Sequence, residues 1–148
     1  MPDTIHLTVA TVVERNGNFL MVRETQDGVQ VINQPAGHVE PGEDVLAAAL
    51  RETFEETGWE VKITGFLGFS NVKSVTSGIT YYRLVFVAEP LQFQEDAEID
   101  SDIDSAEWMT LEQIKDPINK PRSEMVYQAV DDFMSGRIFP LEIFHNGL

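Results

Sequence analysis

Residues 37–59, GHVEPGEDVLAAALRETFEETGW, constrain the fold of this chain more than any other stretch. The segment opens with a turn that contains two glycines and Pro41. It closes on Gly58, the residue type that most readily ends a helix in the left-handed conformation. In between, apolar residues recur at spacings of three and four, at Val45, Leu46, Ala49, Leu50 and Phe54. This period predicts a helix that buries one face.

Three glutamates of this helix are spaced so that their side chains share one side. Glu52, Glu55 and Glu56 stand at positions i, i+3 and i+4. Carboxylates held together repel one another and raise each other's pKa, and a hard divalent cation with oxygen ligands would offset that cost. A solvated acidic face is the alternative interpretation, because Arg51 offers Glu55 an ordinary surface ion pair one turn away.

The complete pattern of the segment favours the first interpretation. From Gly37 to Gly58 the spacing is Gly-x5-Glu-x7-Arg-Glu-x2-Glu-Glu-x-Gly. This pattern resembles the Nudix box, the signature of hydrolases that cleave nucleoside diphosphates linked to another group. Every charged and glycine position of the box is present, whereas Thr53 and Trp59 stand where a bulky aliphatic residue is usual.

The resemblance implies a fold, a cofactor and a set of metal ligands. Nudix proteins have a mixed β-sheet sandwiched between α-helices, and their box glutamates bind Mg²⁺ or Mn²⁺ beside the diphosphate. Carried over to this chain, the ligands are Glu52, Glu55, Glu56 and the main-chain carbonyl of Ala36. Bound ions would polarise phosphoryl oxygens and lower the pKa of the attacking water.

Neighbouring positions of the box are expected to support these ligands. Arg51 would orient a box carboxylate through a charge-assisted hydrogen bond. Gly37 and Glu43 are expected to support the ligands without contacting the metal themselves. For Glu43 the alternative is an ordinary acidic residue in the first turn of a helix.

The sequence leaves two candidates for the general base. Family members use either a box glutamate, here Glu52 or Glu55, or an acid from a later loop. The later acids of this chain lie in the run DSDID at 100–104, and Asp102 stands six residues before Trp108, where family members often carry an acid. A solvated acidic entry to a strand is the alternative interpretation of this run.

Basic residues are scarce, with 10 Lys and Arg against 25 Asp and Glu, so arginines outside the box are candidate phosphate contacts. Arginine suits bidentate contacts with phosphate, which leads us to Arg23, Arg83 and Arg122. Gln34 and Arg122 lie in segments that resemble one phosphatase branch of the family, and that resemblance implies that both contact the substrate. A surface ion pair is the alternative for each arginine, and it is the preferred interpretation for Arg23 and Arg83.

Aromatic and histidine side chains are weaker candidates. Three aromatic residues could stack on a substrate ring but are more often part of a core: Trp59, Tyr81 and Tyr82. The three histidines are interpreted as ordinary hydrogen-bonding residues: His6, His38 and His145.

Segments outside the box resemble one phosphatase branch of the family. They are NQPAGHVE at 33–40, DSDID followed by Trp108, Arg122-Ser123, and SGRIFPLE at 135–142. That branch removes one terminal phosphate from nucleoside tri- and diphosphates, and it hydrolyses hydroxymethylpyrimidine pyrophosphate and thiamine pyrophosphate. The resemblance therefore implies phosphoanhydride hydrolysis with release of inorganic phosphate. A Nudix pyrophosphatase, which releases pyrophosphate or a nucleoside monophosphate, and a nucleotide-sensing module are the alternatives.

Length and composition limit the other possibilities. The 148 residues, 43% of them hydrophobic, fit one domain over 1–148. A net charge of −15 argues against a nucleic-acid partner, and the absence of Cys excludes disulfides and thiolate metal sites. No apolar stretch could cross a bilayer and the N-terminus lacks signal-peptide features. We therefore expect a cytoplasmic monomer or homodimer that acts on a small molecule, without a membrane partner.

The order of elements predicts an α+β fold. Strands are expected at 5–13, 19–23, 29–32, 60–69, 79–88 and 102–109, with a hairpin turn at Asn16-Gly17. Besides the box helix, Thr110 and Ser123 are expected to cap helices that run through Ile114 and Met134. Residues 90–99 are predicted to be an acidic connection, and the apolar tail IFPLEIF at 138–144 is expected to dock on the domain.

Overall fold

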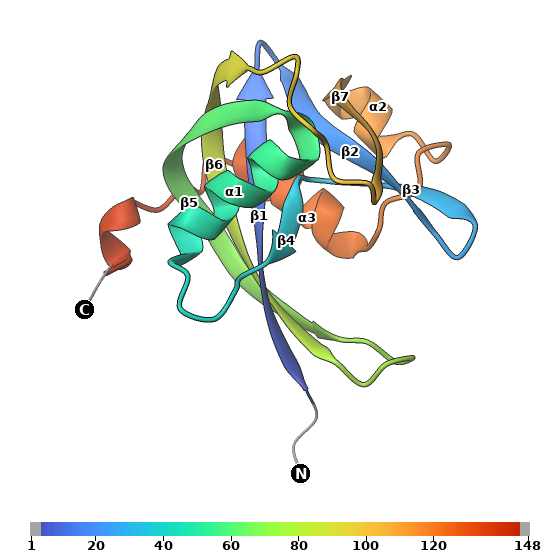
Figure 1. Ribbon diagram of the computed structural model, residues 1–148, viewed down its shortest axis with the longest axis horizontal. Helices are drawn as coiled ribbons and strands as arrows, with labels where there is room; N and C mark the ends of the chain where they lie inside the picture. The colour runs from blue at the N-terminus through green and yellow to red at the C-terminus, as the bar shows by residue number, and fades with distance from the viewer. Residues whose placement is uncertain (1–3, 146–148) are drawn as a thin grey trace.

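A mixed β-sheet with helices on both faces forms the body of the protein, in a computed structural model that describes residues 4–145 (Figure 1). The strand order is β3-β2-β1-β6-β5, with β4 beside β1 and β7 beside β2. The strands are β1 (Ile5–Arg15), β2 (Asn18–Gln26), β3 (Val29–Asn33), β4 (Ala36–His38), β5 (Trp59–Lys73), β6 (Thr80–Phe93) and β7 (Ile103–Thr110). The helices are α1 (Val45–Thr57), α2 (Leu111–Lys115), α3 (Glu124–Met134) and the 3₁₀ helix η1 (Leu141–Ile143). The predicted α+β sandwich is confirmed.

β1 positions the site, because one of its edges pairs with β6 while the other edge is shared by β4 and β2. One edge pairs in parallel with β6 over residues 5–13. The other edge pairs antiparallel with β4 over residues 8–10, and further along with β2 at residues 14 and 15. β4 and β2 therefore part from each other beside β1, and residues of both line the cavity described below.

Side chains of β1 and β6 alternate between two cores. Val9 and Phe86 pack against α1, whereas Val12 and Val85 pack against α3. Because helices cover both faces of the central parts of these strands, residues 9–13 and 84–88 are mostly apolar rather than alternating with polar residues.

The box helix α1 begins and ends where its sequence predicts. The side chain of Asp44 caps its first turn, and Gly58 ends it with φ 77°. Thr53, at a position where the box usually carries an aliphatic residue, is fully buried. Its hydroxyl donates to the Ala49 carbonyl at 2.7 Å and lies 2.8 Å from the hydroxyl of Thr11 on β1. A buried hydroxyl pair therefore seats the helix in place of an aliphatic contact.

The predicted strands are all present, but several end later than predicted, with β1, β2 and β5 continuing to Arg15, Gln26 and Lys73. β6 continues through Pro90 to Phe93, where the sequence predicted a connection that starts at residue 90. Beyond Ala88 this strand pairs with β5 alone, so its other edge is free of a partner strand. Proline lacks a backbone N–H and is tolerated at such an edge position. The short strand β4 was not predicted, because its three residues are too few to show a period.

The hairpin turn, the later helices and the tail follow their predictions. Asn16 and Gly17 have φ values of 53° and 82°. Thr110 and Ser123 cap α2 and α3. In the tail, the ring of Phe144 packs edge-on against a core phenylalanine, with centroids 4.9 Å apart. Across residues 4–145, no helix combines the length and apolarity needed to cross a membrane.

Candidate active site

A cavity of about 1010 Å³ opens beside β1, where β4 and β2 part. Two sets of its lining residues carry the relevant chemistry. The first, here called the carboxylate side, belongs to the box and the residue before it: Ala36, Gly37, Glu52 and Glu56. The second, here called the arginine side, comes from β6 and the start of α3: Arg83, Arg122 and Ser123. The fold thus brings carboxylates and guanidinium groups to one space.

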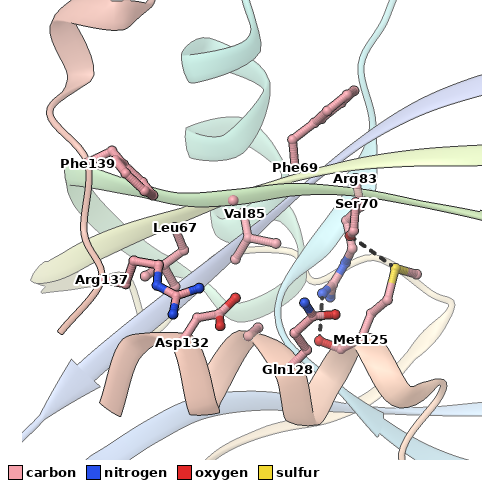
Figure 2. A pocket seen from close by; sticks show the side chains of 12 residues that line it. Leu67, Phe69, Ser70, Arg83, Val85, Met125, Gln128, Asp132, Arg137 and Phe139 are labelled. Atoms are coloured by element: carbon pink, nitrogen blue, oxygen red, sulfur yellow. Dashed lines mark hydrogen bonds between the residues drawn. The ribbon is translucent and has the colours of Figure 1, made fainter. Parts of the chain in front are cut away.

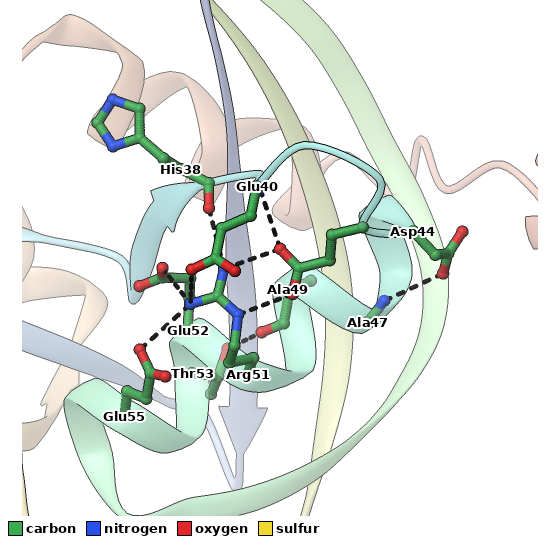
Figure 3. Close-up of polar contacts among 10 residues, drawn as sticks. His38, Glu40, Asp44, Ala47, Ala49, Arg51, Glu52, Thr53 and Glu55 are labelled. Atoms are coloured by element: carbon green, nitrogen blue, oxygen red, sulfur yellow. Dashed lines mark hydrogen bonds and ion pairs between the residues drawn. The ribbon is translucent and has the colours of Figure 1, made fainter.

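Arg51 ties the box together (Figure 3). Its guanidinium donates to Glu43 at 2.7 and 2.9 Å, to Glu52 at 2.7 Å and to Glu55 at 3.2 Å. It also donates to the carbonyl of His38 at 3.0 Å. The planar guanidinium therefore holds the turn before α1 against the helix and fixes two of the predicted ligands.

Glu56 is a buried carboxylate with little compensation for its charge. The residue is 7% exposed, and its Oε1 accepts a hydrogen bond from the backbone N–H of Ala36 at 2.9 Å. Burial, assisted by the charges of Glu24, Glu52 and Asp100, raises the pKa of Glu56 to about 8. Without a cation the carboxyl is therefore mostly protonated at neutral pH, and a cation beside it would favour the ionised form.

Glu52 lies directly against Gly37. A Cβ on residue 37 would overlap the Glu52 carboxyl, so any other residue would displace that carboxylate from its present position. Burial raises the pKa of Glu52, and the hydrogen bond from Arg51 opposes that shift. The requirement for glycine in the box is thus explained by the close approach of a carboxylate to the backbone.

The donor set suits a divalent cation, but its members are not yet gathered around one point. Within residues 4–145, no three His, Asp or Glu side chains are arranged closely enough to hold a metal ion. Glu52 and Glu56 line the cavity, whereas Glu55 is about half exposed and turned to Arg51. Because Glu55 is outside the lining, binding through all three glutamates requires its carboxylate to turn toward the cavity. Oxygen donors and two carboxylates with raised pKa values fit a hard cation.

We expect the metal-free protein to lose stability as the pH rises. The pKa of Glu56 is about 8 in the folded chain and 4.5 for an unperturbed carboxyl. The folded chain therefore favours the protonated carboxyl. The contribution of Glu56 to the free energy of unfolding is complete below about pH 4.5 and is lost progressively as the pH rises through about 8. Measured in excess chelator, the melting temperature should fall by about 5–10 °C over that range. The fall should be much smaller in Glu56→Gln, and equal falls in the two proteins would contradict the burial of a titrating carboxyl here.

Two acids of the 100–104 run line the cavity, Asp100 and Asp102. Asp100 is linked directly to the box helix, because its N–H donates to the carbonyl of Glu55 at 2.9 Å. Its charge also contributes to the raised pKa values of Glu52 and Glu56. Asp100 therefore joins Asp102 as a candidate base, although the sequence pattern singled out Asp102 alone.

Arg23, one of the predicted phosphate contacts, does not line the cavity. Its guanidinium donates twice to Glu107, at 3.0 and 3.1 Å, and once to Asn119 at 3.0 Å. Because side chains alternate along β2, the adjacent Glu24 lines the cavity instead. The ion pair that was the alternative for Arg23 is the one observed.

Gln34, another predicted substrate contact, is also absent from the cavity lining and instead holds other residues of the site. The residue is 1% exposed. Its Nε2 donates to the carbonyl of Val126 at 2.9 Å, and its Oε1 accepts from Arg83 at 3.0 Å. Gln34 therefore positions Arg83 against α3.

Arg83 is an almost fully buried cation held by neutral acceptors. The residue is 5% exposed, and it donates to the side-chain oxygens of Asn33 and Gln34 at 3.0 Å each and to the Met125 carbonyl at 3.3 Å. Burial lowers the pKa of Arg83 to about 10, so the group is charged at neutral pH. The surface ion pair preferred from the sequence is wrong for this residue. A buried, uncompensated positive charge beside a cavity suits an anionic ligand.

Arg122 and the start of α3 complete the arginine side. Arg122 donates to Glu24 at 2.6 Å, and its side chain is 44% exposed. Ser123 caps α3 by accepting the N–H of Met125 at 3.2 Å. A helix N-terminus beside two arginines favours negative charge in this part of the cavity.

A second cavity, of about 250 Å³, lies between α3 and the strands β5 and β6 (Figure 2). Asp132 and Arg137 line it, and it shares Arg83 and Met125 with the larger cavity. No residue of the box lines this space, so we assign the chemistry to the larger cavity.

Several residues of the site carried no usable signal in the sequence. Glu24 is 8% exposed and lies in the cavity between two predicted candidates, Glu56 and Arg122, but nothing local distinguishes it from other strand acids. His38 and Tyr81 also line the cavity, although a core or ordinary polar role was preferred for each. Only strand register, which depends on distant pairings, could have selected them.

Fold, box and cavity together define the class of protein. The chain belongs to the NUDIX domain family, whose model matches residues 4–129, and it is a phosphohydrolase. Nudix hydrolases act on small-molecule phosphoanhydrides and generally use divalent metal ions.

Particular relatives narrow the comparison. The chain is 37% identical to the phosphatase NudJ of Escherichia coli K12 over 138 residues, which cover 93% of this chain and 89% of the relative. The Shigella flexneri phosphatase NudJ gives the same values. A solved NUDIX hydrolase from Nitrosomonas europaea superposes with a TM-score of 0.93 at 32% identity, covering 97% of this chain and 98% of that one. A MutT NUDIX hydrolase from Burkholderia pseudomallei, at 18% identity and a TM-score of 0.74 over 88% of this chain and 98% of that one, shares the fold.

Proposed function

We propose that this protein is a Mg²⁺- or Mn²⁺-dependent phosphatase that removes the terminal phosphate of its substrate. The substrates are nucleoside tri- and diphosphates or pyrimidine pyrophosphates such as hydroxymethylpyrimidine pyrophosphate and thiamine pyrophosphate. The observation that carries the proposal is the cavity in which the carboxylate side and the arginine side meet. The similarity to proteins named phosphatase NudJ supports phosphate as the product.

The carboxylate side, together with Glu55, would hold the cation. Glu52, Glu55 and Glu56 supply carboxylate oxygens, and the carbonyl of Ala36 supplies a main-chain ligand. A bound divalent ion supplies charge neutralisation at phosphoryl oxygens and acidifies water. Arg51 holds Glu52 and Glu55 at 2.7 and 3.2 Å, so it would orient both ligands.

The arginine side would hold the inner phosphate. Arg83 is fixed by three hydrogen bonds and is positioned to receive an anion without moving. Arg122 is exposed enough to exchange Glu24 for a phosphate oxygen. With the inner phosphate held there, the terminal phosphorus would lie toward the carboxylate side. A carboxylate acting as general base would accept the proton of the attacking water there. Asp100 and Asp102 line the cavity and are our candidates for that acid, together with Glu52 and Glu55.

The bond that breaks tests the proposal. A nucleoside triphosphate and Mg²⁺ should yield the nucleoside diphosphate and orthophosphate. In ¹⁸O-water, mass spectrometry should find the label in orthophosphate, because water attacks the terminal phosphorus. Pyrophosphate and a nucleoside monophosphate as products would instead support the pyrophosphatase alternative. Tight binding without turnover would support a nucleotide-sensing module, which the complete set of box glutamates argues against.

A further inference from the structure

Besides the carboxylate and arginine sides, the large cavity has a third set of lining residues with aromatic and hydroxyl side chains, here called the aromatic end. His38 of β4, Tyr81 of β6 and the turn at residues 74–77 line this end. We propose that Tyr81 and His38 hold the heteroaromatic ring of the substrate there. This inference rests on the proposed function and adds to it the residues that select a ring-bearing substrate.

The spacing along β6 places a ring next to a bound phosphate. Tyr81 and Arg83 are two residues apart, so their side chains lie on the same face of the strand, and both line the cavity. At about 3.3 Å per residue they are separated by about 6–7 Å along the strand. A phosphate held by Arg83 therefore leaves the organic part of the substrate beside Tyr81.

Three strands bring the histidines and the tyrosine together. His6 of β1 lies opposite Tyr81 in the sheet, and His38 lies opposite Thr8. Nδ1 of His6 and Nε2 of His38 are 2.9 Å apart, so one ring donates to the other. The rings of His6 and Tyr81 meet edge to face with centroids 5.4 Å apart, and the His38 and Tyr81 centroids are 6.4 Å apart. His6 thus fixes both proposed ring contacts, as a stacking site requires.

The backbone and the side chain of His38 make contacts in different parts of the site. Its carbonyl accepts from Arg51 at 3.0 Å, while its imidazole points away from the Arg51 contacts (Figure 3). Nε2 is used by His6, and Nδ1 makes no hydrogen bond within the described chain. Nδ1 can therefore bond to a polar ring edge, which favours a nitrogen heterocycle over a purely apolar group.

The other aromatic candidates are occupied elsewhere. Tyr82 stacks on Phe69 with centroids 5.7 Å apart and an interplanar angle of 16°. Trp59 packs against Trp108 and Phe93 at 5.5 and 5.4 Å. Of the three aromatic residues considered from the sequence, Tyr81 alone lines the cavity.

Calorimetric titration with Mg²⁺ tests the inference without requiring turnover. The probes are the diimidotriphosphates of adenosine and uridine, in which nitrogen replaces both bridging oxygens so that neither linkage is hydrolysed, and the ring-free inorganic diimidotriphosphate. Tyr81→Ala should lower the affinity for at least one nucleoside analogue by about 10-fold or more. Its affinity for the ring-free probe should change less than about 2-fold, because no stacking contact is lost. Tyr81→Phe, which keeps the ring, should bind all probes nearly as wild type does.

Tyr82→Ala is the matched control, because it removes the neighbouring tyrosine from the opposite face of β6. It should bind the nucleoside analogues as wild type does. Equal losses for ring-bearing and ring-free probes in Tyr81→Ala, or no loss for either nucleoside, would overturn the ring site. Because these are binding measurements, the outcome is independent of which phosphoanhydride is cleaved.

Discussion

Glu56→Gln is expected to lower kcat by about 10³-fold or more while leaving the fold intact. The substitution keeps the size of the side chain and the acceptor for the Ala36 N–H, but it removes a charge that a cation needs. Divalent ions contribute several kcal/mol of transition-state stabilisation in such sites, which is the origin of the magnitude. Because the Glu56 carboxyl is mostly protonated without metal, the amide should cost little stability at neutral pH.

Steady-state rates with saturating Mg²⁺, together with circular dichroism, measure this effect. Glu98→Gln is a matched control, because it makes the same chemical change in an exposed loop outside the cavity lining. Full activity of Glu56→Gln would remove the assignment of the metal site. Full activity of the wild type in excess chelator would do the same.

Asp100→Asn should lower kcat by about 100-fold, with a much smaller change in KM. A general base contributes about 10²–10⁴-fold, and its loss affects the chemical step more than substrate binding. We expect the larger effect at Asp100 because this residue is bonded to the box helix and is coupled to both Glu52 and Glu56.

Asp102→Asn is the informative companion, since it lines the same cavity two residues away. A larger loss of kcat in Asp102→Asn than in Asp100→Asn would identify Asp102 as the base, as the sequence pattern indicated. Wild-type kcat in both variants would place the base among the box glutamates, and the pH–rate profile would then keep its acidic limb in both.

Local sequence signals were sufficient for the elements that local interactions determine. The cap at Asp44, the left-handed Gly58 and the apolar period between them define α1 before any distant contact is known. The turn at Asn16-Gly17 likewise needs φ values that few residue types adopt, so its location is readable from the sequence.

The composition of the cavity could not be predicted in the same way. Arg23 and Glu24 are adjacent, and which of them faces the cavity depends on how β2 pairs with β3 and β7. Gln34 was predicted as a substrate contact because its segment resembles a phosphatase branch of the family, yet it is buried against α3, which begins some ninety residues later. Arg83 suited a surface pair by composition, but β6 carries it into the interior. Each outcome is fixed by long-range register.

Anomalous diffraction from crystals grown with Mn²⁺ and a nucleoside imidotriphosphate tests the central claim most directly. That claim is that the carboxylate side holds the cation while the arginine side holds the inner phosphate of the same substrate. We predict an anomalous peak about 2 Å from carboxylate oxygens of Glu52 and Glu56, with the terminal phosphate beside it and the inner phosphate bonded to Arg83 or Arg122. A peak away from α1, or an analogue bound in the smaller cavity between α3 and β5, would contradict it.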